Sequence, residues 1–334
     1  MSMAVKTIRV GVIGVGYLGT FHARKYAVMG GVELVGVADP DQDQAGRVAE
    51  ELGTAMFTDY HDLLPLVDAV SIVVPTIYHH RVARDCIAGN IDLLVEKPFT
   101  TTLAEADELI DSAREKKLIL QVGHLERFNP AVLAMQPFLT HPLFIEAHRI
   151  SVFKNRGTDV DVILDLMIHD IDIILSIINS PLKTIHTVGA PVITQLTDIA
   201  NARLIFENGC TANVTVSRIS MDNIRRMRIF QPGQYISVDF SKKEVMSIRL
   251  KRGKQNDQPL PDISKYGFPN QDTLELELLD FINNVRTRAT PVVSGIEGRR
   301  ALAIALEVVE QIRKNREQVE QLLGPVTNYS GLDG

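Results

Sequence analysis

Residues 8–39 constrain the fold most, because they combine two apolar strand-like runs with a glycine-rich turn between them. The first run leads into Gly14-Val15-Gly16-Tyr17-Leu18-Gly19, and a helix-like segment then connects this turn to the second run. Gly14 permits the tight turn, Gly16 lets the backbone approach a pyrophosphate, and Gly19 lets helix and strand pack closely. The helix N-terminus offers N–H groups and a positive dipole end to phosphates. The pattern predicts a dinucleotide-binding unit.

The second strand of this unit ends on Asp39. A carboxylate there accepts both hydroxyls of an adenosine ribose and repels a 2′-phosphate, so the sequence favours NAD over NADP unless a neighbouring basic residue reverses the preference. Tyr17 either packs near the nicotinamide or packs against a second domain. The turn and strand end predict these cofactor contacts: Gly14, Gly16, Tyr17, Leu18, Gly19 and Asp39.

The composition is that of a globular protein. With 334 residues, two domains are expected. A net charge of -6 argues against a nucleic-acid surface. Cys86 and Cys210 form neither a disulfide framework nor a metal-ligand pattern. The N-terminus has no signal-peptide pattern, and ionisable residues interrupt the apolar stretch at 162–178. We therefore expect a soluble cytoplasmic protein without nucleic-acid or membrane partners.

The order of the expected elements predicts an α/β protein with two domains. Strands and helices alternate over residues 1–123, which predicts a Rossmann domain with a doubly wound parallel sheet. Residues 124–334 are expected to form an α+β domain for substrate binding and oligomerisation, because several strands between 184 and 250 follow one another without helices. Such strands predict an open, largely antiparallel sheet. Residues 251–272 are expected to form a long loop.

Three segments follow strands of the predicted parallel sheet, where ligands bind in this fold class. They are residues 74–80, Glu96-Lys97-Pro98 and Gly123-His124. The proline restricts the backbone of Lys97 and so fixes its direction. A lysine there would hydrogen-bond a substrate hydroxyl and stabilise charge on its oxygen; the alternative is a surface lysine that happens to follow a strand. The cofactor contacts predicted at these strand ends are Pro75, Thr76, His79, Glu96 and Lys97.

The second candidate for chemistry is a predicted helix at 162–178. Asp165, His169, Asp172 and Ser176 recur at helical spacing and are expected to share one face. His169 is suited to accept a hydroxyl proton near neutral pH, and Asp165 would orient its ring. The alternative is an Asp–His pair that only ties the helix to its neighbours. A metal site from these residues with His79, His80 and His124 is not favoured, because no tight ligand pattern is present.

The chain resembles the Gfo/Idh/MocA oxidoreductase family over nearly its whole length. The resemblance is carried by four motifs: GVGYLG at 14–19, a P-x-x-x-H loop at 75–79, EKP at 96–98 and DLMIHDID at 165–172. It implies a Rossmann domain, an α+β domain whose sheet mediates oligomerisation, and a tightly held nicotinamide. It also implies that Lys97, Asp165 and His169 are catalytic. The family's frequent Gly-Gly pair before the catalytic helix is replaced here by residues 158–161, which bears on substrate preference.

Within the family, residues 123–132 and 163–176 most resemble bacterial UDP-N-acetylglucosamine 3-dehydrogenases. That resemblance implies oxidation of a nucleotide sugar to a 3-keto product, used by an aminotransferase in lipid A biosynthesis, and a homo-oligomer (dimer or tetramer). A free sugar or cyclic polyol such as an inositol is the alternative substrate, and a non-catalytic NAD(H)-binding regulator is the alternative function. The predicted substrate contacts are His124, Arg127, Asn129, Lys154, Arg156 and Asp172.

Overall fold

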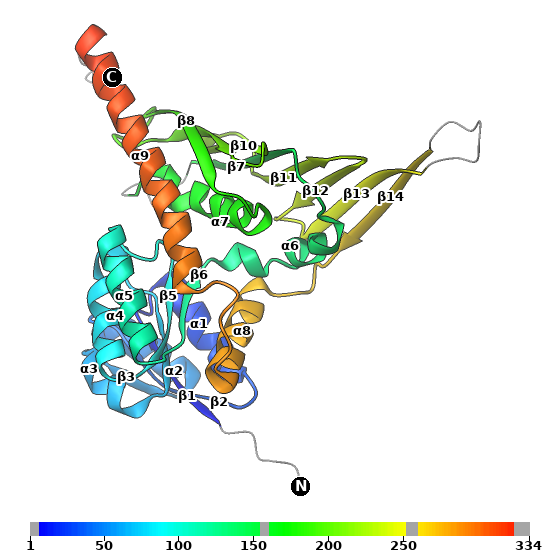
Figure 1. The fold of residues 1–334 in the computed structure, drawn as a ribbon. Helices are drawn as coiled ribbons and strands as arrows, with labels where there is room; N and C mark the ends of the chain where they lie inside the picture. Colours follow the sequence, from blue (N-terminus) through cyan, green and yellow to red (C-terminus); the bar gives the residue numbers. More distant parts are fainter. Residues whose placement is uncertain (1–6, 154–159, 252–259, 324–334) are drawn as a thin grey trace. The chain divides into compact units, whose positions relative to one another are not determined.

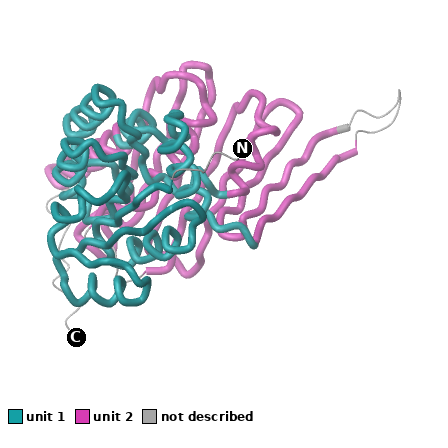
Figure 2. The backbone as a smooth tube through the Cα atoms, turned by 90° about the horizontal axis from the view of Figure 1, so that it is seen from below, with its two compact units in different colours: residues 1–129, 270–302 teal, residues 130–269, 303–334 magenta. Residues whose placement is uncertain are grey.

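The computed structural model describes residues 7–153, 160–251 and 260–323. The chain divides into two compact units (Figure 2). Unit 1 comprises residues 1–129 and 270–302, and unit 2 comprises residues 130–269 and 303–334. This division differs from a single boundary after Gly123, because residues 270–302 group with the first part of the chain. No described helix is long and apolar enough to span a membrane.

Unit 1 contains a six-stranded parallel sheet in the order β3-β2-β1-β4-β5-β6. This order confirms the predicted Rossmann fold, and it places the switch in strand order between β1 and β4, where such sheets bind ligands. The strands are β1 (Ile8–Ile13), β2 (Val32–Ala38), β3 (Ala55–Phe57), β4 (Ala69–Ile72), β5 (Asp92–Glu96) and β6 (Leu120–Gly123).

Helices lie on both sides of this sheet, with α4 and α5 on one side and α1 and α8 on the other (Figure 1). Thr102 and Glu105 form a capping box at the start of α5. The helices of unit 1 are α1 (Tyr17–Val28), α2 (Gln42–Leu52), α3 (Tyr60–Leu63), α4 (His79–Ala88), α5 (Leu103–Glu115), α8 (Thr273–Thr287) and the start of α9 (Gly295–Leu323).

Helix α8 explains why residues 270–302 belong to unit 1. Its Leu278, Phe281 and Ile282 are fully buried in one apolar cluster with Val10 of β1 and Tyr26 of α1. Burying an apolar side chain of this size stabilises a fold by about 1.5–3 kcal/mol. The Rossmann core is therefore completed by a helix that lies far from it in sequence.

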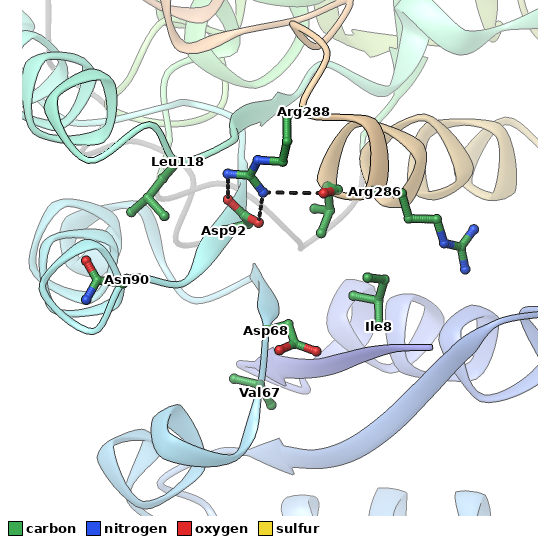
Figure 3. A pocket seen from close by; sticks show the side chains of 9 residues that line it. Ile8, Val67, Asp68, Asn90, Asp92, Leu118, Arg286 and Arg288 are labelled. Carbon is green, nitrogen blue, oxygen red and sulfur yellow. Dashed lines mark hydrogen bonds and ion pairs between the residues drawn. The ribbon is translucent and has the colours of Figure 1, made fainter. Parts of the chain in front are cut away.

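The amino-terminal ends of the strands in unit 1 surround a pocket of about 600 Å³ (Figure 3). The Arg288 guanidinium donates to both carboxylate oxygens of Asp92, at 2.5 and 2.9 Å, and also to the carbonyl of Lys117 at 2.7 Å. Asp68 accepts from Arg9 at 3.0 Å, and Arg286 donates to the Gly31 carbonyl at 2.5 Å. The charged side chains that line this pocket are thus paired within the protein.

Unit 2 contains an eight-stranded sheet in the order β14-β13-β12-β11-β7-β10-β9-β8. All of its pairings are antiparallel except β7 with β10, which confirms the expected open, largely antiparallel sheet. Helices α6 (Pro130–Met135) and α7 (Ile168–Ile177) pack against its strands (Figure 1). The strands are β7 (Phe144–Val152), β8 (Leu182–Ala190), β9 (Ile199–Phe206), β10 (Thr211–Ser220), β11 (Ile224–Gln231), β12 (Gln234–Asp239), β13 (Glu244–Lys251) and β14 (Leu260–Gly267).

Two expectations for unit 2 were wrong. Residues 260–267 are not part of a loop, because they form the edge strand β14 and pair with β13 along its length. The helix at 162–178 is not uniformly α-helical, because residues Ile163–Met167 form a π-helical segment before α7 begins. The Ile168 amide donates to the Ile163 carbonyl, five residues back. The strict α-helical spacing therefore does not extend back to Asp165, whereas His169, Asp172 and Ser176 all lie within α7 and keep the predicted spacing.

Candidate active site

The glycine turn of unit 1 has the geometry that a bound pyrophosphate requires. Gly14 has a φ of +85°, and a Cβ there would lie 2.6 Å from the carbonyl oxygen of Val73. A Cβ at Gly19 would overlap the carbonyl of Gly14, so α1 and the turn can pack this closely only with glycine. At Gly16, in contrast, a Cβ would meet no protein atom within 4 Å. The backbone at Gly16 is therefore open to a ligand, at the N-terminus of a helix with no acidic residue in its first turn.

Asp39 lies beside this turn and holds it. Its Oδ2 accepts from the Val15 amide at 2.9 Å, and its Oδ1 accepts from the Asp41 amide at 3.0 Å. Each carboxylate oxygen has a second lone pair for a ribose hydroxyl. Gly14, Gly16 and Asp39 line a pocket of about 1020 Å³. Its volume and chemistry fit a dinucleotide, with the pyrophosphate at the turn and the adenosine ribose at Asp39.

The loop after β4 is tied to the segment that carries Lys97. His79 is buried, and its Nδ1 lies 2.9 Å from the carbonyl of Pro98 while its Nε2 lies 2.8 Å from the carbonyl of Val74. Burial lowers the pKa of His79, and the carbonyl contacts, which favour the protonated ring, offset part of this. The ring thus joins two strand-end loops, while Pro75 lines the dinucleotide pocket and Thr76 is half-buried beside it in sequence.

Lys97 directly follows β5 and is half-buried. Its amide donates to Oε2 of Glu96 at 3.2 Å, and the Lys97–Pro98 peptide bond is cis. The Glu96 side chain is buried beneath this segment. In the turn, Tyr17 is 67% exposed with an edge contact to Phe21, so its ring does not belong to the core of unit 1. Leu18 is half-buried next to it.

The segment after β6 carries the predicted substrate residues of unit 1. His124 is buried, and burial together with the positive charges of Lys97 and Arg127 lowers its pKa to about 3. Its ring is therefore neutral at neutral pH, beside two cations. Arg127 is half-buried and contacts the Val292 carbonyl at 3.4 Å. Asn129 is buried and donates to Glu126 at 3.1 Å, so its amide also fixes this segment.

Unit 2 carries the predicted Asp–His pair in and directly after the π-helical segment. Asp165 lies in that segment and His169 lies in the first turn of α7, and both are half-buried. Asp172 is buried, whereas Ser176 is exposed and donates to the carbonyl of Ile173. The four polar residues thus differ in how far they are buried. π-Helical insertions frequently mark functional sites.

Sequence reasoning missed the residue that fixes this helix. Arg149 of β7 donates to both carboxylate oxygens of Asp170 at 3.0 Å, and both side chains are buried. The pair ties α7 to β7 at the residue that directly follows His169. The signal was present in the sequence, because Arg149 continues the alternating buried positions of Ile145 and Ala147 in this strand, and a buried arginine needs a carboxylate partner.

Two further predictions fall partly or wholly beyond what the structure describes. Lys154 and Arg156 lie outside the described residues, as do Thr158 and Asp159 of the segment that departs from the family pattern. Within the described ranges, no group of three or more histidine, cysteine, aspartate or glutamate side chains has the arrangement of a metal site.

Comparison with known proteins identifies the family. Residues 8–124 match the oxidoreductase family with an NAD-binding Rossmann fold, and residues 140–231 match the GFO/IDH/MocA C-terminal domain. The chain belongs to the Gfo/Idh/MocA oxidoreductase family. The family uses NAD, in agreement with the fit of the dinucleotide pocket.

Among its relatives, the chain is 39% identical to UDP-N-acetylglucosamine 3-dehydrogenase from Acidithiobacillus ferrooxidans, over 90% of this chain and 96% of that protein. A solved structure of that enzyme superposes with a TM-score of 0.87 and covers 92% of this chain and 98% of its own. Myo-inositol 2-dehydrogenase from Thermotoga maritima is 25% identical over 95% of this chain and its own full length.

Proposed function

We propose that the protein is an NAD-dependent dehydrogenase that oxidises the C3 hydroxyl of UDP-N-acetylglucosamine to a 3-keto nucleotide sugar. The observation that carries the proposal is the 39% identity with a UDP-N-acetylglucosamine 3-dehydrogenase over nearly the full length of both chains. The inositol dehydrogenases among the relatives are less similar, at 25–31% identity. The retained Lys97, Asp165 and His169 support catalysis rather than a purely regulatory role.

In this proposal each side chain has one task. Bound NAD supplies the hydride acceptor. His169 accepts the proton of the reacting hydroxyl, and Asp165 orients its ring and stabilises the imidazolium. The Lys97 ammonium hydrogen-bonds the same oxygen and stabilises its developing negative charge. Neutral His124, Arg127 and Asn129 contact the sugar or diphosphate together with Asp172, and Lys154 and Arg156 add positive charge for the diphosphate.

The test is the appearance of NADH absorbance when the protein is mixed with NAD and UDP-N-acetylglucosamine. A ketone-trapping reagent must be present, because oxidation of a secondary alcohol by NAD is uphill near neutral pH. We expect turnover by the wild type and a loss of about 10²–10⁴-fold in His169→Ala, the contribution of a general base. His186→Ala, which removes an exposed histidine from β8 of the same unit, is the matched control and should keep wild-type activity.

The substrate arms of this assay separate the alternatives. Turnover of a free inositol or sugar, with none of the nucleotide sugar, would replace the nucleotide-sugar assignment by the polyol alternative. NAD binding without turnover of any sugar would favour the non-catalytic regulator. Equal activity of His169→Ala and wild type would remove His169 as the base while leaving the substrate assignment intact.

The proposal also includes the setting of the reaction. A 3-keto nucleotide sugar suits a downstream aminotransferase on a lipid A route, and both NAD and UDP-sugars are cytoplasmic metabolites. We propose a homo-oligomer, dimer or tetramer, formed through the sheet of unit 2. Support comes from three cross-strand aromatic neighbours on one face, Phe144, Phe230 and Tyr235. Phe230, which is 36% exposed, stacks on Phe144 and makes a tilted contact with Tyr235. Light scattering measures the molar mass in solution. We expect an oligomer for the wild type and a smaller mass for Phe230→Asp.

A further inference from the structure

A buried polar contact lies beside Lys97 in unit 1, and the steps proposed above do not use it. His22 of α1 has no exposed surface, and its Nε2 lies 3.3 Å from Oε1 of Glu96 at the end of β5. Neither ring nitrogen makes a hydrogen bond of good geometry among the described residues, and the contact of Nε2 with the Glu96 carboxylate is at ion-pair distance. The contact joins the helix that follows the dinucleotide turn to the residue before Lys97.

The Glu96 carboxylate is confined on its other sides as well. Its Oε2 accepts the amide of Lys97 at 3.2 Å. Gly123 of β6 lies opposite Glu96 in the sheet, and a Cβ there would lie 2.7 Å from Oε1 and 3.0 Å from Oε2. A buried carboxylate is costly unless it is paired and hydrogen-bonded. The Glu96 carboxylate is thus held between the His22 imidazole, the Lys97 amide and the Gly123 backbone, where there is no side chain.

This arrangement links the two parts of unit 1 that hydride transfer must align. Gly16, where the pyrophosphate fits, is the N-cap residue of α1, and Lys97 directly follows β5. A misplacement of about 1 Å between reacting groups can lower a rate by about 10²-fold. We propose that His22 is a positioning residue that, through Glu96, holds Lys97 in register with the cofactor-binding turn. The inference rests on the function proposed for Lys97.

Tyr26 provides a matched control on the same helix. It is also fully buried, one turn after His22, and its hydroxyl lies 2.9 Å from Oγ of Ser71 in β4. This contact also joins α1 to the sheet through a buried polar pair, but it ends on a residue within β4 rather than beside Lys97. Tyr26→Phe therefore removes a helix-to-sheet hydrogen bond of the same kind, made to Ser71 and not to Glu96, and phenylalanine keeps the ring in place.

The experiment compares His22→Leu, His22→Gln and Tyr26→Phe in the full chain, with two measurements. Hydrogen exchange of the Lys97 amide, resolved by NMR, reports the hydrogen bond to Glu96 that protects it. Steady-state kinetics report kcat and the KM for NAD. We expect His22→Leu to speed exchange of this amide and to lower kcat, each at least about tenfold, with KM within about twofold. The amide of His22→Gln can donate to Glu96 and should restore most of both, and Tyr26→Phe should change neither.

Several results would overturn the proposal. One is a His22→Leu variant whose exchange at the Lys97 amide and whose kcat match those of Tyr26→Phe. Another is faster exchange with unchanged kcat, which would make the contact structural only. If His22→Leu does not fold, Glu96→Gln takes its place as the variant that weakens the contact, and it is compared with His22→Gln in the same two measurements. If the wild type oxidises no sugar, the proposed function fails, whereas the exchange comparison still decides whether His22 fixes the Lys97 segment.

Discussion

The two edges of the parallel sheet in unit 1 carry similar side chains in different arrangements. At the amino edge, Arg288 pairs with Asp92 around a pocket of about 600 Å³. At the carboxyl edge, Asp39 and open glycine backbone line a pocket of about 1020 Å³ that fits a dinucleotide. Charges that pair with each other stabilise the fold, whereas charges and amides aimed at a pocket are available to a ligand. The difference predicts that substitutions at one edge change stability and those at the other change activity.

The strongest test of this contrast is Lys97→Met at the carboxyl edge. If the Lys97 ammonium stabilises the reacting oxygen as proposed, losing it should lower kcat by about 10²–10⁴-fold, while the unfolding midpoint in urea should stay near wild type. Lys116→Met is the matched control, because Lys116 caps the carbonyls of Ile87 and Ala88 at the other edge. Two results would contradict the contrast. One is a Lys97→Met variant whose unfolding midpoint falls together with its kcat, and the other is a Lys116→Met variant that loses kcat but keeps the wild-type midpoint.

The converse test is Arg288→Met at the amino edge. It leaves the buried carboxylate of Asp92, 8% exposed, without its bidentate partner. Removing one member of a fully buried pair costs about 3–5 kcal/mol, and because Arg288 is 47% exposed we expect a loss of about 2 kcal/mol in the free energy of unfolding. Arg288 has a φ of +58°, and methionine is strained there to a similar degree. The change in unfolding free energy therefore measures the lost side-chain contacts and not a change in backbone strain. Urea unfolding measures it, with the exposed Arg114→Met as control, and kcat should stay within about twofold.

The same contrast explains what the sequence could predict. The carboxyl edge was readable because glycine spacing and a terminal acid follow from local backbone needs, and Gly14, Gly16 and Asp39 lie where the pattern placed them. The amino edge was not readable, because Arg288 and Asp92 meet only after α8 returns to the sheet. A local sequence pattern cannot predict a contact between residues that lie 196 positions apart.

Unit 2 shows the same limit at two further places. The π-helical segment at Ile163–Met167 has an apolar pattern that an α-helix would also bury, so spacing alone could not reveal the change in hydrogen bonding. The Pro and Gly content of residues 251–272 is typical of a loop, so the sequence did not predict strand β14. In the structure, residues 260–267 pair with β13. Edge strands tolerate proline, and β14 includes Pro261.

A pH series sharpens the comparison at the carboxyl edge. The pKa of His124 is lowered to about 3 in the folded protein, whereas in the unfolded chain it is near 6.5. Between these values the unfolded state binds more protons, so stability falls as pH drops below 6.5, by up to about 1.4 kcal/mol per pH unit. His124→Asn should therefore lose less stability than wild type between pH 6.5 and 5. Urea unfolding at both pH values measures this, and His79, whose pKa is also lowered, leaves part of the slope in the variant.

The smallest expected effect concerns the choice between NAD and NADP. It tests whether the carboxyl edge distinguishes the ribose 2′-hydroxyl from a 2′-phosphate. Asp39→Ser removes the charge that repels a 2′-phosphate, while Arg81 and Arg84 line the same pocket and can attract one. We expect the ratio of kcat/KM for NAD over NADP to fall by about tenfold, equivalent to about 1.4 kcal/mol.

Asp39 also binds the amides of Val15 and Asp41, so a general loosening of the turn must be separated from a change in recognition. Asp39→Asn keeps an oxygen acceptor but not the charge, and it should shift the ratio in the same direction with less loss of NAD affinity. Arg81→Ala, added to Asp39→Ser, should remove the gain for NADP. If both Asp39 variants weaken NAD and NADP equally, Asp39 supports the turn but does not select the cofactor, and the carboxyl edge then resembles the amino edge at this position.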